Sequence, residues 1–208
     1  MRKIIVITFV LLLMVVGLSQ QPVLAQLTFE FGGGAHSPED IHYSPSYGKR
    51  AYNVFAVLGV NLFRAGPLLF KATGEASFMW DKGETTFTQR ELKLSLSQFG
   101  GGVRVLLMIK PEWFVPYGEA GVIKGFLKEK YPQGFGGDVS CSDDGSYFGG
   151  GIRLPLSFCG FPKWFLDVNI RKTKLDVKPF DETIELGGSS LRIGLQYKFN
   201  LPFIGSKK

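Results

Sequence analysis

Eight segments of this chain alternate apolar and polar residues with a period of two, and this pattern is the strongest constraint on its fold. Successive side chains of a β-strand point to opposite faces, so each segment predicts a strand with one face in an apolar environment. Glycine is plentiful, at 27 of 208 residues, and no long stretch has the spacing of an amphipathic helix. We predict an all-β fold with strands over residues 27–34, 51–64, 68–80, 97–109, 114–128, 146–158, 164–176 and 189–199.

The connections between these segments alternate between short and long. Short connections span 65–67, 110–113 and 159–163, whereas long ones span 35–50, 81–96, 129–145 and 177–188. In an up-and-down antiparallel sheet, this alternation places all short connections at one end and all long ones at the other. Outer-membrane barrels have short periplasmic turns and long external loops, and their strands need roughly 9–11 residues to cross the bilayer. The sequence therefore predicts an eight-stranded antiparallel up-and-down transmembrane β-barrel.

One face of the predicted strands carries charges of both signs. This face would contact water in a soluble barrel, but it lines the interior of a membrane barrel, where the apolar face meets lipid. Opposite charges inside a narrow barrel can pair, which offsets the cost of removing each one from water. We predict a lumen charge network of Glu30, Lys71, Glu75, Arg104, Glu119, Arg153, Asp167, Arg171 and Arg192.

Aromatic residues gather near the predicted strand ends, as in the interfacial girdles of membrane proteins. The predicted aromatic girdle consists of Phe63, Phe78, Trp80, Trp113, Phe114, Trp164, Tyr197 and Phe199. Glycine also recurs within the strands, at Gly74 and in the runs 100–102 and 149–151. Glycine allows a small, strongly curved sheet to bend and neighbouring side chains to pack over it.

The N-terminus has the features of a secretory signal peptide. Arg2 and Lys3 precede an apolar run over residues 4–18, and Ala25 supplies a small residue at a plausible cleavage site. The apolar run is short for a retained membrane anchor, which needs roughly 20 residues. We expect residues 1–25 to be a cleaved signal peptide and residues 26–208 to form the barrel domain, exported to the bacterial outer membrane.

The two cysteines, Cys141 and Cys159, are predicted to be free thiols. The strand map places Cys141 in a long external loop and Cys159 in a short periplasmic turn. A strand of about 13 residues, or about 40 Å, separates them, whereas a disulfide requires Cα atoms within about 7 Å.

The sequence offers little support for catalysis or for cofactor binding. The only two histidines, His36 and His42, fall in the first long connection, with no serine and carboxylate at a spacing typical of a hydrolase. Together with Glu39 and Asp40 they are conceivable metal ligands, but the spacing matches no strong motif. A weak cation site in the acidic stretch 134–145 is a further alternative, less favoured than a solvated loop. We expect no catalytic, cofactor or metal site.

Short motifs resemble the OmpA/OmpX-like outer-membrane β-barrel family. The stretch 114–121 (FVPYGEAG) is similar to a P-Y-x-x-x-G strand of that family, and 149–153 (GGGIR) is similar to the strand that follows it. The last predicted strand, 189–199, resembles the family's aromatic-ended C-terminal strand. One departure is that residues 200–208 follow Phe199, where the family often ends on a terminal Phe. The resemblance implies an eight-stranded barrel inserted by the outer-membrane assembly machinery.

These features favour a small outer-membrane protein with a structural or surface-interaction role, in adhesion or envelope integrity. The expected partners are outer-membrane lipid, lipopolysaccharide and an extracellular ligand of the long loops, and a monomer is expected. The formal charge of +6 falls by 2 to +4 without Arg2 and Lys3, and the excess is spread along the chain, so nucleic-acid binding is not indicated. Three alternatives remain: a narrow porin-like channel, a secreted lipocalin-like barrel that binds an apolar ligand, and a lipid-modifying enzyme.

Overall fold

A computed structural model of the chain describes residues 26–39, 47, 50–84, 91–109, 113–130, 139–177 and 184–200. The predicted signal peptide, residues 1–25, lies outside the described residues, as do residues 201–208. Among the helices of the described part, none is long and apolar enough to cross a membrane.

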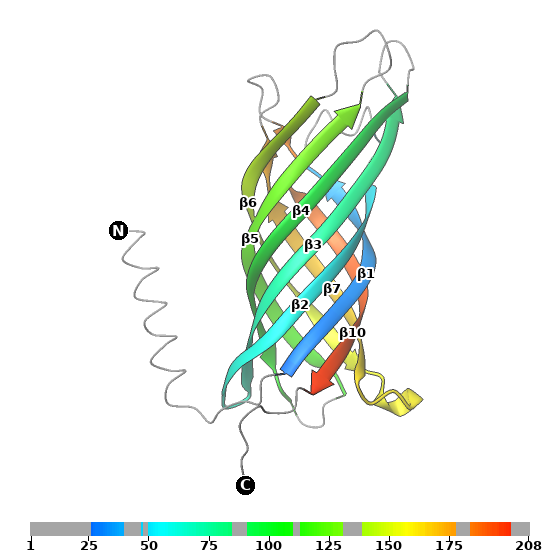
Figure 1. Ribbon diagram of the computed structural model, residues 1–208. Coiled ribbons are helices and arrows are strands. Elements are labelled where there is room, and N and C mark those ends of the chain that lie inside the picture. The colour runs from blue at the N-terminus through cyan, green and yellow to red at the C-terminus, as the bar shows by residue number, and fades with distance from the viewer. Residues whose placement is uncertain are drawn as a thin grey trace, which may run out of the picture.

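Eight strands close into an antiparallel barrel in which each strand pairs with its neighbours along the chain (Figure 1). The first and last strands pair from Gln26 with Asn200 to Pro38 with Gly188, which closes the ring. The barrel strands are β1 (Gln26–Pro38), β2 (Ala51–Ala65), β3 (Leu68–Glu84), β4 (Glu91–Leu107), β5 (Val115–Lys130), β6 (Val139–Pro155), β7 (Trp164–Lys174) and β10 (Gly188–Asn200). The predicted fold class is therefore confirmed.

Three small elements accompany the barrel. A 3₁₀ turn, η1 (Ser157–Cys159), lies in the connection between β6 and β7, where Gly160 adopts a left-handed φ of 84°. The two-residue strands β8 (Asp176–Val177) and β9 (Ile184–Glu185) form a separate hairpin between β7 and β10. Apart from Asp176, this hairpin lies in the predicted long connection 177–188, because two-residue strands are too short to show a periodic pattern.

The four strands β3 to β6 rise beyond the others at the end that carries the long connections (Figure 1). We call this end the long-loop end, the opposite one the short-turn end, and residues 81–84, 91–96, 127–130 and 139–145 the raised wall. The prediction that 81–96 and 129–145 are loops is wrong for the residues of the raised wall, which continue the strand ladder. The same correction moves Cys141 from an external loop onto β6.

The raised wall has the opposite polarity from the rest of the barrel. Below it, Phe78 and Trp80 face outward and are about half exposed, whereas Glu75 faces inward. Within it, Leu92 and Leu94 are buried inside, and Lys93 is exposed outside. Outward side chains must be apolar only where they contact lipid, so this inversion marks the upper limit of the lipid-facing band. The inverted polarity also explains why the sequence pattern predicts loops for the residues of the raised wall.

Three layers fill the lumen, and β5 shows their order. Leu127 and Ile123 near the long-loop end join an apolar cluster, Glu119 lies in a charged layer below it, and Val115 near the short-turn end borders a second apolar cluster. The upper cluster consists of Ala51, Met79, Leu94, Leu96, Ile123, Leu127, Tyr147, Leu175 and Leu186.

Candidate functional site

The charged layer is centred on Arg104 of β4, which is 2% exposed. Its guanidinium lies 2.9 Å from the carboxylate of Glu30 on β1 and 2.9 Å from that of Glu119 on β5. Asp167 on β7 is a third anionic neighbour, at 3.5 Å. Arg104 thus connects four strands of the barrel through its contacts, and its planar fork of donors suits this multiple pairing.

A second arginine, Arg171 of β7, connects opposite walls. It pairs with Glu75 of β3 at 2.5 Å and with Glu119 of β5 at 2.7 Å. Arg192 of β10 also pairs with Glu75, at 3.1 Å. In the closed strand order, β7 and β3 are separated by three strands in either direction, so they stand opposite each other. The Arg171–Glu75 pair therefore crosses the full width of the lumen.

Uncharged side chains complete this layer, and the sequence analysis did not single them out. The Tyr117 hydroxyl donates to Asp167 Oδ1 at 2.5 Å, and Asn169 Nδ2 donates to Glu119 Oε1 at 3.1 Å. The Arg171 guanidinium stacks 3.9 Å from the centroid of the Tyr147 ring. These residues share the inward strand face with the charged residues. Their position in the apolar and polar alternation therefore indicates that they also face the lumen.

Inward glycines make room for the large luminal side chains. A Cβ atom added at Gly102 or Gly121 would lie 2.5 or 2.6 Å from the Tyr147 hydroxyl, and one at Gly151 would lie 2.6 Å from the Tyr117 hydroxyl. Real Cβ atoms do not approach other atoms so closely. The strand glycines therefore allow tyrosines to fill a narrow interior.

The structure buries all nine residues of the predicted lumen network. Seven of them join in the contacts described above, whereas Lys71 and Arg153 lie nearer the short-turn end. Lys71 Nζ donates to Thr28 Oγ1 at 2.8 Å, and Arg153 Nε lies 3.7 Å from Asp167 Oδ2. Lys71 and Arg153 therefore line a cavity and do not lie at the centre of the charged layer.

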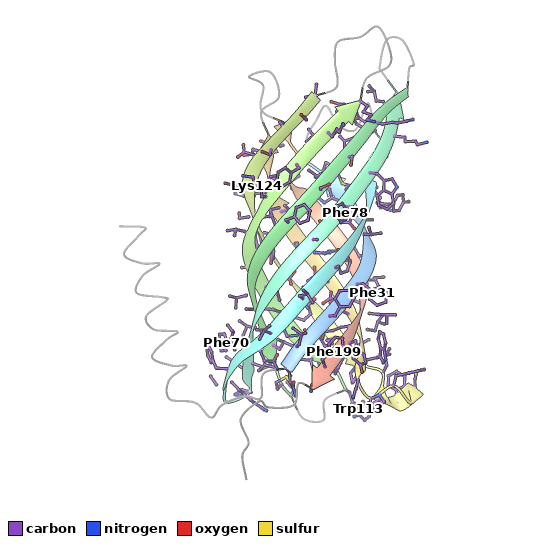
Figure 2. The ribbon with its side chains drawn as sticks, viewed as in Figure 1. Phe31, Phe70, Phe78, Trp113, Lys124 and Phe199 are labelled. Atoms are coloured by element: carbon purple, nitrogen blue, oxygen red, sulfur yellow. The ribbon has the colours of Figure 1, made fainter. Side chains whose placement is uncertain are left out.

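The predicted girdle residues fall into two groups on the outer surface (Figure 2). Phe78 and Trp80 lie toward the long-loop end, where Phe78 contacts Phe99 with ring centroids 6.0 Å apart. Near the short-turn end, the Tyr197 ring makes edge-to-face contacts with Trp164 and Phe199, with ring centroids 5.0 and 4.6 Å apart. The remaining predicted members also lie near this end, and they are Phe63, Trp113 and Phe114.

His36 and Glu39, the described residues of the conceivable histidine site, each contact another group. His36 is buried on β1 with its Nε2 3.3 Å from the Leu186 carbonyl oxygen, and Glu39 pairs with Lys172 at 2.6 Å. His42, Asp40 and the stretch 134–138 lie outside the described residues. Within the described ranges, no three His, Cys, Asp or Glu side chains are grouped for a metal ion. Both cysteines are free, as predicted.

Lysines form a row across the outside of the raised wall. Lys82 on β3 lies directly opposite Lys93 on β4, which in turn lies opposite Lys130 on β5. All three are exposed, and Lys128 is exposed next to them. A cleft of about 250 Å³ runs between these lysines, and Trp80, Asp81, Leu94 and Ser95 also line it.

The chain matches the model of the outer membrane protein β-barrel domain over residues 8–199. It belongs to this family. Membership agrees with the OmpA/OmpX-like resemblance, and it places the protein in the bacterial outer membrane. The outward apolar belt, with Ile170 66% and Ile193 52% exposed, meets lipid in that setting. The secreted, soluble lipocalin-like alternative is therefore wrong.

Solved structures of outer-membrane proteins share the barrel. The crystal structure of Ail from Yersinia pestis, in complex with the heparin analogue sucrose octasulfate, is 14% identical over 85% of this chain and 100% of that chain, with a TM-score of 0.57. Neisserial surface protein A is 14% identical over 84% and 97%, with a TM-score of 0.55. OprG from Pseudomonas aeruginosa is 13% identical over 85% and 97%, with a TM-score of 0.56. At these identities the likeness shows the fold alone. No curated protein sequence matches the chain.

Proposed function

We propose that this small outer-membrane barrel is a closed, non-catalytic anchor that supports envelope integrity by contacting anionic groups of lipopolysaccharide. The Arg171–Glu75 pair across the lumen is the observation that carries the closed-lumen part of the proposal. Eight strands leave an interior only wide enough for side chains. Here the charged layer and the apolar cluster above it both occupy that space. This arrangement favours an anchor over the porin-like alternative.

The row of lysines on the raised wall carries the surface part of the proposal. Lys82, Lys93 and Lys130 occupy adjacent positions on three paired strands, and like charges directly opposite each other destabilise a sheet. Asp81 in the same cleft offsets part of this repulsion, and anions bound along the row would offset more of it. Phosphate and carboxylate groups of lipopolysaccharide are anions of this kind.

The height of the row on the barrel favours lipopolysaccharide over a distant partner. The lysines face sideways from the outer wall, immediately beyond Trp80 and Phe78, where the outward face changes from apolar to polar. Trp commonly marks the boundary between hydrocarbon and headgroups. With the long-loop end outside the cell, the row stands at the level of the lipopolysaccharide headgroups. Binding of a sulfated sugar analogue by Ail, a protein of the same fold, is consistent with a basic surface of this type.

Stability measurements in two kinds of membrane test the surface role. We expect the protein to unfold at a higher urea concentration in vesicles containing lipopolysaccharide than in phosphatidylcholine vesicles. The double variant Lys93→Gln/Lys130→Gln should lose most of this difference, and high salt should reduce it in the wild type. The control Lys163→Gln removes an exposed lysine at the opposite, short-turn end and should retain the difference. An unchanged difference in the Lys93/Lys130 variant would contradict the role of the row.

A further inference from the structure

We propose that the short-turn end of the lumen is a binding site for a small organic oxyanion. A cavity of about 280 Å³ lies there, below the charged layer. It is lined by residues near the start of β1, β3, β5 and β7 and near the end of β2, β4, β6 and β10, together with Met108. This site is separate from the raised wall, and it goes beyond the proposed envelope role.

The polar lining of the cavity is strongly cationic. Arg64, Lys71, Arg153 and Lys198 all border it, and the described residues of its lining include no Asp or Glu. Lys71 and Arg153 are 1% and 6% exposed, so bulk water reaches them poorly. An excess of buried charge of one sign is costly unless an ion of the opposite sign compensates it.

Arg153 has unused hydrogen-bonding capacity. Its Nε and Nη2 atoms are buried and have no hydrogen-bond partner among the described residues. Its nearest carboxylate oxygen, Oδ2 of Asp167, is 3.7 Å away from Nε, too far for a hydrogen bond. Buried donors are almost always satisfied in native proteins, and an exception calls for an unseen partner such as an ion or water.

Three of the four buried carboxylates of the lumen are engaged away from the cavity, and the fourth, Asp167, pairs with Arg104 and more distantly with Arg153. Among the described residues, the buried charges of the lumen comprise five Lys or Arg side chains and four carboxylates, which leaves one positive charge in excess. Glu30, Glu75 and Glu119 make their short ion pairs with Arg104, Arg171 and Arg192. Within the described part of the chain, Lys71 forms no ion pair. The excess charge is therefore concentrated at the cavity.

The apolar part of the cavity lining and the position of the cavity opening limit the class of ligand. Leu69, Leu106, Met108, Val115 and Phe165 supply an apolar wall. The volume is near the lower end of the range for small-molecule sites, about 300–1,000 Å³. Arg64 is exposed and Lys198 is half-buried, so a ligand would enter from the short-turn end. A compact apolar group carrying one carboxylate or phosphate fits these features, with the oxyanion between Arg153 and Lys71.

Titration of the full chain in a non-ionic glucoside detergent tests this site. The probes are butyrate, inorganic phosphate and the neutral analogue butyramide, and the readouts are calorimetry and the NMR signal of the Arg153 Nε–H group. We expect a saturable shift of this signal with butyrate or phosphate and none with butyramide, while the Arg171 signal stays unchanged. Because the readout is made on the wild-type protein, it does not depend on whether a variant folds.

Substitutions then assign the binding to the cavity. Arg153→Met should weaken anion affinity by about 10-fold or more, the usual effect of losing a charge-assisted hydrogen bond. Lys163→Met removes an exposed lysine at the same end of the barrel and should leave affinity unchanged. The proposal fails if neither anion shifts the Arg153 signal at millimolar concentration, if butyramide shifts it equally, or if Lys163→Met weakens binding as much as Arg153→Met.

Discussion

The guanidinium of Arg171 lies 2.5 Å from the carboxylate of Glu75, and the two residues come from strands on opposite sides of the barrel. Glu75 also pairs with Arg192, and Arg171 also pairs with Glu119. Four strands are therefore tied together through the centre of the lumen, in addition to their backbone ladders. The interior of this barrel is therefore a packed core held together by ion pairs between strands, and not the polar lining of an open channel.

Removal of the charge on Glu75 should destabilise the barrel strongly. Glu75→Gln leaves Arg171 and Arg192 without their shared carboxylate in a buried setting, and breaking buried pairs in this way costs about 3–5 kcal/mol. Reversible urea unfolding in lipid vesicles measures this loss. Asp144→Asn is the matched control, because Asp144 is 82% exposed and pairs with Lys124 at 3.7 Å. We expect no measurable change in the free energy of unfolding for that variant. An equally small change for Glu75→Gln would contradict a core held together by these ion pairs.

Substitution of an inward glycine should be far more damaging than substitution of an outward one. Gly121→Ala places a methyl group against Tyr147, whereas a Cβ at Gly74 meets no atom within 4 Å. Overpacking of this kind costs about 1–3 kcal/mol, and Gly74→Ala should change the free energy of unfolding by less than about 0.5 kcal/mol. The same urea titration compares the two. Equal effects at both positions would mean that the tyrosines have space that the structure does not show.

Cysteine labelling should reveal the orientation of the barrel in the membrane. Cys159 is exposed in η1 at the short-turn end, and Ser142 is exposed on the raised wall at the other end. In cells, a membrane-impermeant maleimide should label Cys159 in a Cys141→Ala background only after the outer membrane is permeabilised. Ser142→Cys, made in a background without the native cysteines, should react in intact cells. The reverse pattern would place the raised wall in the periplasm and remove the basis of the proposed lipopolysaccharide contact.

The lipid-spanning part of the strands was predictable because the lipid-facing side chains there are apolar. The alternation of Phe70, Ala72 and Phe78 with Lys71 and Glu75 is sufficient by itself to predict the two faces of β3. The closed ring then followed from an even number of strands and the alternation in loop length.

The raised wall was missed for a physical reason. Beyond the bilayer the outer face contacts water, so Lys93 and Ser95 replace lipid-facing apolar residues while Leu94 and Leu96 turn inward. A pattern with inverted polarity, interrupted by Ser, Asp and Gly, has the composition of a loop. Only the hydrogen-bonded register with neighbouring strands shows that it is sheet.

The partners within the lumen depend on the closure of the barrel. Sequence alternation identified Arg171 and Glu75 as inward-facing, but their meeting depends on the number and tilt of the strands between them. The same is true of the cationic cavity, whose lining comes from all eight barrel strands. The position of a residue in the period-two alternation determines which face of the sheet it lies on, whereas the tertiary fold determines which residue it contacts.

Single-channel recording in planar lipid bilayers tests the closed lumen most directly. With the wild-type protein inserted, the ion pairs of Arg104 and Arg171 and the apolar cluster above them should block ions, so we predict little or no conductance. Long-lived open channels formed by the wild-type protein at modest voltage would contradict the closed barrel and favour the porin-like function.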